Sequence, residues 1–198
     1  MEPLSKIYKE RFFSGRESLS WRAPILAKNI KELFSPKTVV DVGCAIGDVV
    51  QALIDLEIDA SGLEGSPEAE PYLVCDRKRV LFHDLRELLP QKNQFDFVLS
   101  LEVAEHIEPD YAARYVRNLC DLGDRILISA APPGQKGHYH VNCQPKHYWQ
   151  NMFQEFGYKR DTQRESQWCA LLEPWRHKKE MTAYMNNILY FYRENKQR

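Results

Sequence analysis

The sequence predicts an α/β fold in which helices cover both faces of a mostly parallel sheet. Five short runs rich in valine, isoleucine and leucine are typical of strands buried on both faces. Segments with helical spacing lie between several of these runs, and this alternation is typical of parallel sheets. The 198 residues suit one domain with a full hydrophobic core.

The order of the elements follows from the apolar runs and the turn residues between them. The expected strands cover residues 38–43, 59–64, 80–84, 95–100 and 124–129, and the expected helices cover residues 48–54, 110–119 and 145–155. Two later segments, residues 166–172 and 187–192, also look like strands. We therefore expect the sheet to end in a C-terminal antiparallel hairpin.

The N-terminal part of the chain carries helix-compatible segments with large aromatic side chains, namely Tyr8, Phe12, Phe13 and Trp21. These side chains could form a lid over an active site, or they could pack as ordinary core. We expect a single domain in which residues 1–36 form a helical lid and residues 37–198 form the catalytic core.

The charge balance of the chain is nearly even, with 27 basic and 28 acidic residues. No overall field attracts nucleic acid or anionic lipid, although a local basic patch is left open. The chain shows neither a signal peptide nor a long apolar run, so we expect a cytoplasmic protein without a membrane partner. Its five cysteines form no C-x-x-C pair, which indicates reduced thiols. The oligomeric state is open.

The strongest local signal is the segment at the end of the first expected strand. Asp41, Gly43, Cys44, Ala45 and Gly47 lie where this strand turns into a helix. Small residues in such a turn let the backbone approach a ligand, and Asp41 can accept hydrogen bonds at its mouth. Turns of this kind also bind dinucleotides or pack tightly without a ligand, so the loop alone does not name the cofactor.

Carboxylates also end the second and third expected strands. Glu64 follows the loop by about 20 residues, the spacing at which Rossmann sites hold ribose hydroxyls. Asp84 could accept a hydrogen bond from an adenine amino group. Either carboxylate could instead be solvated at a strand end. Because parallel strands end at one edge of the sheet, the sequence predicts a nucleoside site there.

The pattern Asp41-x-Gly43-x-Ala45-x-Gly47 resembles the first motif of class I S-adenosylmethionine-dependent methyltransferases, with Ala45 where the family usually has its middle glycine. The similarity extends in order over residues 39–157 and includes Glu64, His83-Asp84-Leu85 and the segment 95–106. This resemblance implies a Rossmann-like fold, S-adenosylmethionine as cofactor and methyl transfer as activity. It also implies cofactor contacts from Leu85, Leu101 and Glu102.

Two histidines are the candidates for chemistry on the acceptor. His106 follows the fourth strand and could act as a general base, or it could only order the following segment. His140 lies in a polar loop, residues 137–147, directly after a strand end. Glu102, Glu105 and these histidines could also converge on a metal, and that cluster resembles the one in small-RNA 3′-end 2′-O-methyltransferases. The sequence alone assigns no metal ligand.

The preferred interpretation is an enzyme that methylates an oxygen or nitrogen of a small molecule, with a sugar or another secondary metabolite as candidate. One alternative is a metal-assisted RNA 2′-O-methyltransferase. Another is a protein that binds S-adenosylmethionine without catalysis. A nicotinamide oxidoreductase fits less well, because the loop from Gly43 to Gly47 differs from the pattern expected there.

Overall fold

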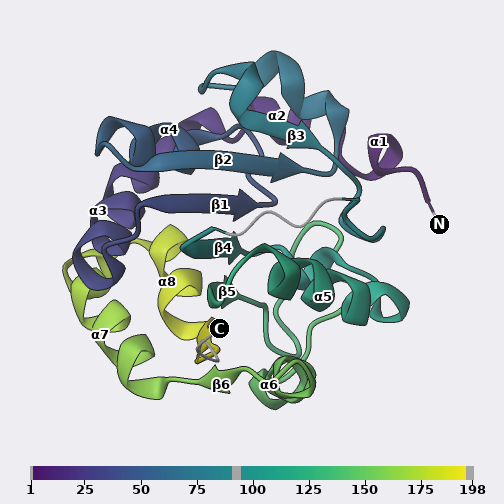
Figure 1. The fold of residues 1–198 in the computed structure, drawn as a ribbon. Helices are drawn as coiled ribbons and strands as arrows, with labels where there is room; N and C mark the ends of the chain where they lie inside the picture. Colours follow the sequence, from purple (N-terminus) through teal and green to yellow (C-terminus); the bar gives the residue numbers. More distant parts are fainter. Residues whose placement is uncertain (1, 91–94, 195–198) are drawn as a thin grey trace.

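The computed structural model describes residues 2–90 and 95–194, and these form a seven-stranded sheet in the order β3-β2-β1-β4-β5-β7-β6 (Figure 1). The strands are β1 (Thr38–Val42), β2 (Asp59–Glu64), β3 (Val80–Phe82), β4 (Phe97–Leu101), β5 (Arg125–Ser129), β6 (Lys159–Arg160) and β7 (Ile188–Tyr192). β1 to β5 are parallel, whereas β7 is antiparallel to both β5 and β6. The carboxyl ends of the parallel strands therefore share one edge.

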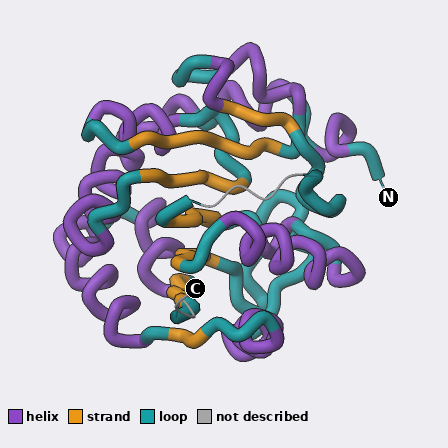
Figure 2. Tube along the Cα trace, viewed as in Figure 1, coloured by secondary structure: helices purple, strands orange, loops and turns teal. Residues whose placement is uncertain are grey.

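Helices lie on both sides of the sheet (Figure 2). The α-helices are α1 (Leu4–Ile7), α2 (Glu10–Ser14), α3 (Ala23–Phe34), α4 (Asp48–Asp55), α5 (Ala112–Leu122), α6 (Lys146–Glu155), α7 (Thr162–Leu172) and α8 (Lys179–Asn186). Short 3-10 turns are η1 (Glu17–Arg22), η2 (Pro67–Tyr72), η3 (Arg77–Arg79), η4 (Ala104–His106), η5 (Pro109–Tyr111) and η6 (Glu173–Trp175). None of the helices in the described ranges is long and apolar enough to cross a membrane.

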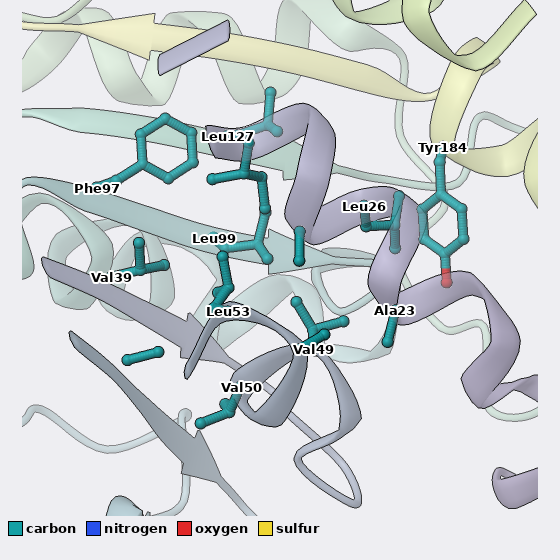
Figure 3. Packing of buried hydrophobic residues seen from close by; sticks show 14 of the residues in the cluster. Ala23, Leu26, Val39, Val49, Val50, Leu53, Phe97, Leu99, Leu127 and Tyr184 are labelled. Atoms are coloured by element: carbon teal, nitrogen blue, oxygen red, sulfur yellow. The ribbon is translucent and has the colours of Figure 1, made fainter. Parts of the chain in front are cut away.

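The alternation of side chains along the strands divides the core into two layers. Phe97 and Leu99 of β4 and Leu127 of β5 pack with α3, α4, α7 and α8. Figure 3 shows these three side chains beside residues of α3 and α4. Val98 and Ile126 point to the other face and pack with α5 and α6. Both faces of the central strands are thus buried, which explains their continuous apolar runs.

The predicted fold class and the five parallel strands are confirmed, with strand ends that differ by at most two residues. The prediction of a strand over residues 166–172 is wrong, because this segment belongs to α7. The Asp161 carboxylate accepts a hydrogen bond from the Arg164 backbone at 3.0 Å and caps that helix. Glu165, Trp168 and Leu172 are buried at helical spacing. The strand that pairs with β7 at the edge of the sheet is therefore β6, and the two are joined through α7 and α8 rather than by a tight turn.

The N-terminal segment has two structural roles. α3 is part of the core, since Leu26 and Ile30 are buried and the Phe34 ring lies 4.6 Å from that of Phe97. In Figure 1, α1 lies on the side toward which the arrowheads of β1 and β2 point. Only the part of the chain before α3 therefore lies near the carboxyl ends of the strands, where a lid over the site would lie. The division into a lid of residues 1–36 and a core of residues 37–198 stays a prediction.

The contrast between buried and exposed leucines gives a test of this packing. Leu127 is fully buried at the centre of the sheet, whereas Leu81 on the edge strand β3 is 54% exposed. We expect Leu127→Ala to lower the free energy of unfolding by about 2–5 kcal/mol, because it leaves a cavity. Leu81→Ala should change it by about 0.5 kcal/mol or less. Urea denaturation of both variants would show this difference, and equal losses would contradict the described core.

Candidate functional site

The loop after β1 is folded tightly against the ends of two other strands. The backbone N–H groups of Gly43 and Cys44 both donate to the Leu63 carbonyl oxygen, at 2.7 and 3.0 Å. Gly43 has a φ of +82°, and a Cβ there would overlap the Val103 side chain. Ala45 also has a positive φ, +49°, which is uncommon for a residue with a side chain. The loop after β1 thus combines small side chains with backbone conformations that glycine favours.

Two adjoining pockets open at this loop. The first is lined by Leu4, Tyr8, Phe12, Arg16, Gly43, Ala45, Glu64, Gly65, Asp84, Leu85, Arg86, Glu102, Val103, His106 and Ile107. The second is lined by Arg16, Arg22, Ala23, Leu26, Asp41, Gly43, Cys44, Ala45, Ile46, Asp48, Val49, Leu101 and Tyr184. They share Arg16, Gly43 and Ala45. One extended ligand could therefore occupy both pockets across the loop.

The first pocket contains the buried carboxylate of Glu64. One of its oxygens accepts a hydrogen bond from the Ala45 backbone N–H at 2.8 Å, and the other accepts one from Ser66 at 2.9 Å. Burial raises the pKa of Glu64 to about 7, although the backbone donors partly offset this effect. The hydrogen bonds fix the carboxylate at the pocket wall, where each oxygen keeps a lone pair for a ligand.

The second pocket brings acidic and basic side chains together. Burial, followed by the charges of Asp48 and Glu64, raises the pKa of Asp41 to about 8. No described residue donates a hydrogen bond to the Asp41 carboxylate. Arg16 lies over the Phe12 ring at 4.4 Å, and its guanidinium forms no ion pair with the described part of the chain. This pocket can accept a ligand that carries both charges.

Asp84 lines the first pocket, but its carboxylate already has a partner. Arg86 donates to both of its oxygens, at distances from 2.7 to 3.2 Å. Burial alone would raise the pKa of Asp84, but the ion pair with Arg86 outweighs this effect and holds the pKa below its usual value. The same guanidinium contacts Glu108 at 3.0 Å. A contact from Asp84 to an adenine amino group stays a prediction, and it would use the lone pairs that Arg86 leaves.

Glu102 and His106 bound the first pocket on the side of β4. Glu102 has a φ of +55°, and its backbone N–H donates to Ser129 Oγ at 2.7 Å. Nδ1 of His106 lies 3.2 Å from the Tyr139 carbonyl oxygen. Burial and the neighbouring His140 lower the pKa of His106 to about 4, so its imidazole is neutral at pH 7. With Nδ1–H donating to the carbonyl, the lone pair lies on Nε2.

His140 lies beside His106 but lines neither pocket. The two rings meet edge to face, with centroids 5.0 Å apart, and Nδ1 of His140 lies 3.1 Å from the Gln135 carbonyl oxygen. One ligand atom each from Glu105, His106 and His140 lie within 4.8 Å of one another. Burial, with the charge of Glu102 second, raises the pKa of Glu105 well above its usual range. The two predicted catalytic residues, His106 and His140, thus lie in one cluster with the acidic side chains of Glu102 and Glu105.

The tertiary structure brings together most of the predicted cofactor contacts. Nine of them line the two pockets, namely Asp41, Gly43, Cys44, Ala45, Glu64, Asp84, Leu85, Leu101 and Glu102. Gly47 lines neither pocket; it has a φ of +71° at the start of α4, and a Cβ there would lie 2.5 Å from Cys75 Sγ. Sequence reasoning missed Arg16, Arg22 and Tyr184. No helical spacing could have placed Arg16 on the pocket side, because Tyr8 precedes α2 and Arg16 follows it.

Comparison with known proteins gives one family match. A family model described as a methyltransferase domain matches residues 18–128. A search among curated proteins finds no significant match. Many solved structures have the same fold.

Three solved structures illustrate this similarity. An O-methyltransferase family protein from Burkholderia thailandensis is 13% identical, with a TM-score of 0.63 over 92% of this chain and 58% of that one. DesVI from Streptomyces venezuelae is also 13% identical, with a TM-score of 0.59 over 81% of this chain and 92% of that one. A SAM-dependent methyltransferase from Archaeoglobus fulgidus is 19% identical, with a TM-score of 0.56 over 73% of this chain and 69% of that one. At such identities the likeness concerns the fold. The chain spans about half the length, 48–52%, of the first solved structures that it matches.

The raised pKa values predict how stability depends on pH. The folded protein keeps protons on Asp41 and Glu64 up to about pH 8 and 7, whereas the unfolded chain releases them near pH 4. The free energy of unfolding should therefore fall as the pH rises from 5 to 8, by at most about 1.4 kcal/mol per pH unit and group. Asp41→Asn should flatten this slope, and the exposed control Asp55→Asn should keep it. Denaturation curves at several pH values measure this, and an unchanged slope in Asp41→Asn would contradict the prediction.

Proposed function

The chain belongs to the family of S-adenosylmethionine-dependent methyltransferase domains, and we propose that it methylates an oxygen or a nitrogen atom of a small molecule. The observation that carries this proposal is the pair of adjoining pockets at the loop after β1. One has the groups that suit a nucleoside, and the other has the charges that suit an amino acid. S-adenosylmethionine combines these two parts.

The nucleoside part of the cofactor suits the first pocket. Glu64 offers carboxylate lone pairs to two ribose hydroxyls, and its hydrogen bonds to the backbone hold it in place for them. Leu85 and Ile107 give the same pocket apolar walls for an adenine ring. Asp84 lies on this wall too, in agreement with its predicted place at the adenine. These contacts support the cofactor residues assigned from the sequence.

The amino acid part of the cofactor suits the second pocket. The buried carboxylate of Asp41 can accept hydrogen bonds from an ammonium group, and the ammonium would favour its charged form. Arg16 and Arg22 line the same pocket and can pair with a carboxylate. In this assignment the ammonium group of the cofactor pairs with Asp41, and its carboxylate pairs with Arg16 and Arg22.

The acceptor would meet the pocket at His106. When bound, the cofactor supplies a methyl group on a sulfonium sulfur, which a nucleophile attacks in line. His106 Nε2 carries a free lone pair and can take the proton of an acceptor hydroxyl or amine. His140 packs against the His106 ring and keeps its orientation, so we assign a catalytic role to His106 and a supporting one to His140.

The surroundings of His106 favour a small acceptor. The Tyr8 ring lies 6.0 Å from His106, 5.8 Å from His138 and 6.5 Å from Tyr139. His138 Nε2 also lies 2.8 Å from the Ile7 carbonyl oxygen, which ties the loop after β5 to α1. Tyr8 and His106 line the same pocket, and its aromatic wall suits a sugar or another small metabolite. With a net charge of −1, the chain gives no general attraction for RNA.

Methyl transfer to a defined acceptor tests this proposal. The protein is incubated with deuterium-labelled S-adenosylmethionine and a panel of sugars, phenols and amines, and mass spectrometry follows the labelled product. We expect transfer to a member of the panel, a rate lower by about 10²–10⁴ for His106→Ala, and an unchanged rate for the exposed control His147→Ala. Methyl transfer to RNA and to no small molecule would contradict the proposed class of acceptor. Cofactor binding without any transfer would support a non-catalytic protein.

Calorimetric titration separates the two halves of the cofactor site. Asp41→Asn should weaken S-adenosylmethionine binding by about 10- to 100-fold, because a charge-assisted hydrogen bond is lost. It should leave methylthioadenosine binding unchanged, since that ligand lacks the amino acid part. Glu64→Gln should weaken both ligands, and the exposed control Glu155→Gln should weaken neither. Equal effects of Asp41→Asn on the two ligands would contradict the assignment of the second pocket.

A further inference from the structure

A cavity of about 600 Å³ lies at the amino ends of β4 and β5, on the opposite edge of the sheet from the first and second pockets. The end of β7 and the start of α7 also line it, and it shares no described lining residue with either pocket. Three arginines, three aspartates and two tyrosines make up most of its lining. Its volume is in the range of sites for small organic ligands. We propose that this cavity binds a small organic anion, with an oxyanion group on Arg125 and Arg164 and a planar ring against Tyr192.

The carboxyl end of α3 brings the two arginines together. Nη1 of Arg125 donates to the Phe34 carbonyl oxygen at 2.9 Å. Nη1 of Arg164 donates to the Leu33 carbonyl oxygen at 3.1 Å. Because these carbonyl groups belong to consecutive residues of one helical turn, the two guanidinium groups lie near each other. Burial raises the pKa of the Tyr190 hydroxyl, and the positive charges of Arg125 and Arg164 partly offset this effect. Both guanidinium groups therefore lie near this hydroxyl.

Both guanidinium groups keep donors that no described residue uses. Arginines often bond to the last carbonyl oxygens of a helix, but this structural role takes up only part of each group here. Arg125 donates through Nε and Nη1, which leaves Nη2. Arg164 donates through Nη1, which leaves the edge formed by Nε and Nη2. Such an edge can donate two parallel hydrogen bonds to one carboxylate or phosphate group.

The aspartates of the cavity already have partners. Asp124 pairs with Arg193 at 2.7 Å. The Asp96 carboxylate accepts hydrogen bonds from two backbone N–H groups, at 2.9 and 3.1 Å, and the Asp161 carboxylate caps α7. Arg125 and Arg164, in contrast, form no ion pair with the described part of the chain. A ligand that completes the partners of this cavity therefore carries a negative charge.

Tyr192 offers a flat apolar surface beside these donors. The Phe34 and Tyr190 rings lie 4.9 Å apart, and the Tyr192 ring follows at 6.5 Å from Tyr190 with the two planes 18° apart. Tyr190 is buried within this row, whereas Tyr192 is only half-buried and contacts no further ring of the described residues. A planar group of the ligand can stack there. Binding of an anion in this cavity does not depend on methyl transfer at the opposite edge.

Calorimetric titration with phenyl phosphate, benzoate and inorganic phosphate tests the site. We expect one equivalent of phenyl phosphate or benzoate to bind, and the tighter of the two identifies the preferred oxyanion. Arg125→Gln and Arg164→Gln should weaken this binding by roughly tenfold or more, because charge-assisted hydrogen bonds are lost. Inorganic phosphate should bind more weakly than phenyl phosphate, and Tyr192→Leu should reduce that difference, because the ligand ring loses its stacking partner.

Two control variants locate the bound anion. Arg16→Gln removes a guanidinium group that lines both the first and the second pocket, and Arg117→Gln removes an exposed one on α5. Both variants should bind phenyl phosphate and benzoate like the parent. Loss of binding in Arg16→Gln would place the anion in the first two pockets and overturn the proposal.

Thermal unfolding checks that each variant is folded, since both arginines of the cavity also bond to α3. If Arg125→Gln does not fold, Arg164→Lys serves, because it keeps the positive charge near α3 and loses the edge that donates two parallel hydrogen bonds. Absence of binding of both organic anions by the parent, or equal binding by the parent and the Arg164 variants, would overturn the proposal.

Discussion

The neighbouring carboxyl ends of β1 and β4 are the constraint on which the site depends. From β1 the chain continues to β2 on one side of the pair, and from β4 it continues to β5 on the other side. Because the two connections diverge, a crevice opens between them at the edge of the sheet. Gly43 allows these ends to approach, since any Cβ there would overlap Val103. Both pockets begin at this contact and extend to either side of it.

Three of the five non-glycine residues with positive φ in the described ranges lie around the same crevice. Ala45, Glu102 and Tyr139 have φ values of +49°, +55° and +52°, a region that side chains disfavour by about 1–3 kcal/mol. Hydrogen bonds hold two of these residues, from Ala45 N–H to Glu64 and from Glu102 N–H to Ser129 Oγ. Ala45 stands where related methyltransferases usually have glycine, and its backbone keeps the conformation that glycine favours. The loop therefore retains its shape at an energetic cost that the surrounding contacts offset.

The sequence predictions succeeded where the signal was local. The family and the fold class are confirmed, because one continuous motif after β1 and the alternation of strands and helices carry them. The prediction for residues 166–172 was wrong for an equally local reason. Trp168 and Leu172 look like strand residues, but the Asp161 cap and burial at helical spacing place them in α7. The antiparallel end of the sheet was predicted, but β6 forms it rather than this segment.

The sequence by itself determined the loop after β1 and the acidic residues at the ends of the first three strands, because strands that alternate with helices run parallel and end on one edge. Only the tertiary structure decided what meets these groups. Arg16 reaches the second pocket from the segment before α3, and His140 reaches His106 from the loop after β5. Such contacts join residues far apart in the chain, and packing of the whole sheet sets them. Among the described residues, no hydrogen-bond donor reaches the buried Glu105 carboxylate, and this has the same origin, because burial depends on every element around a residue.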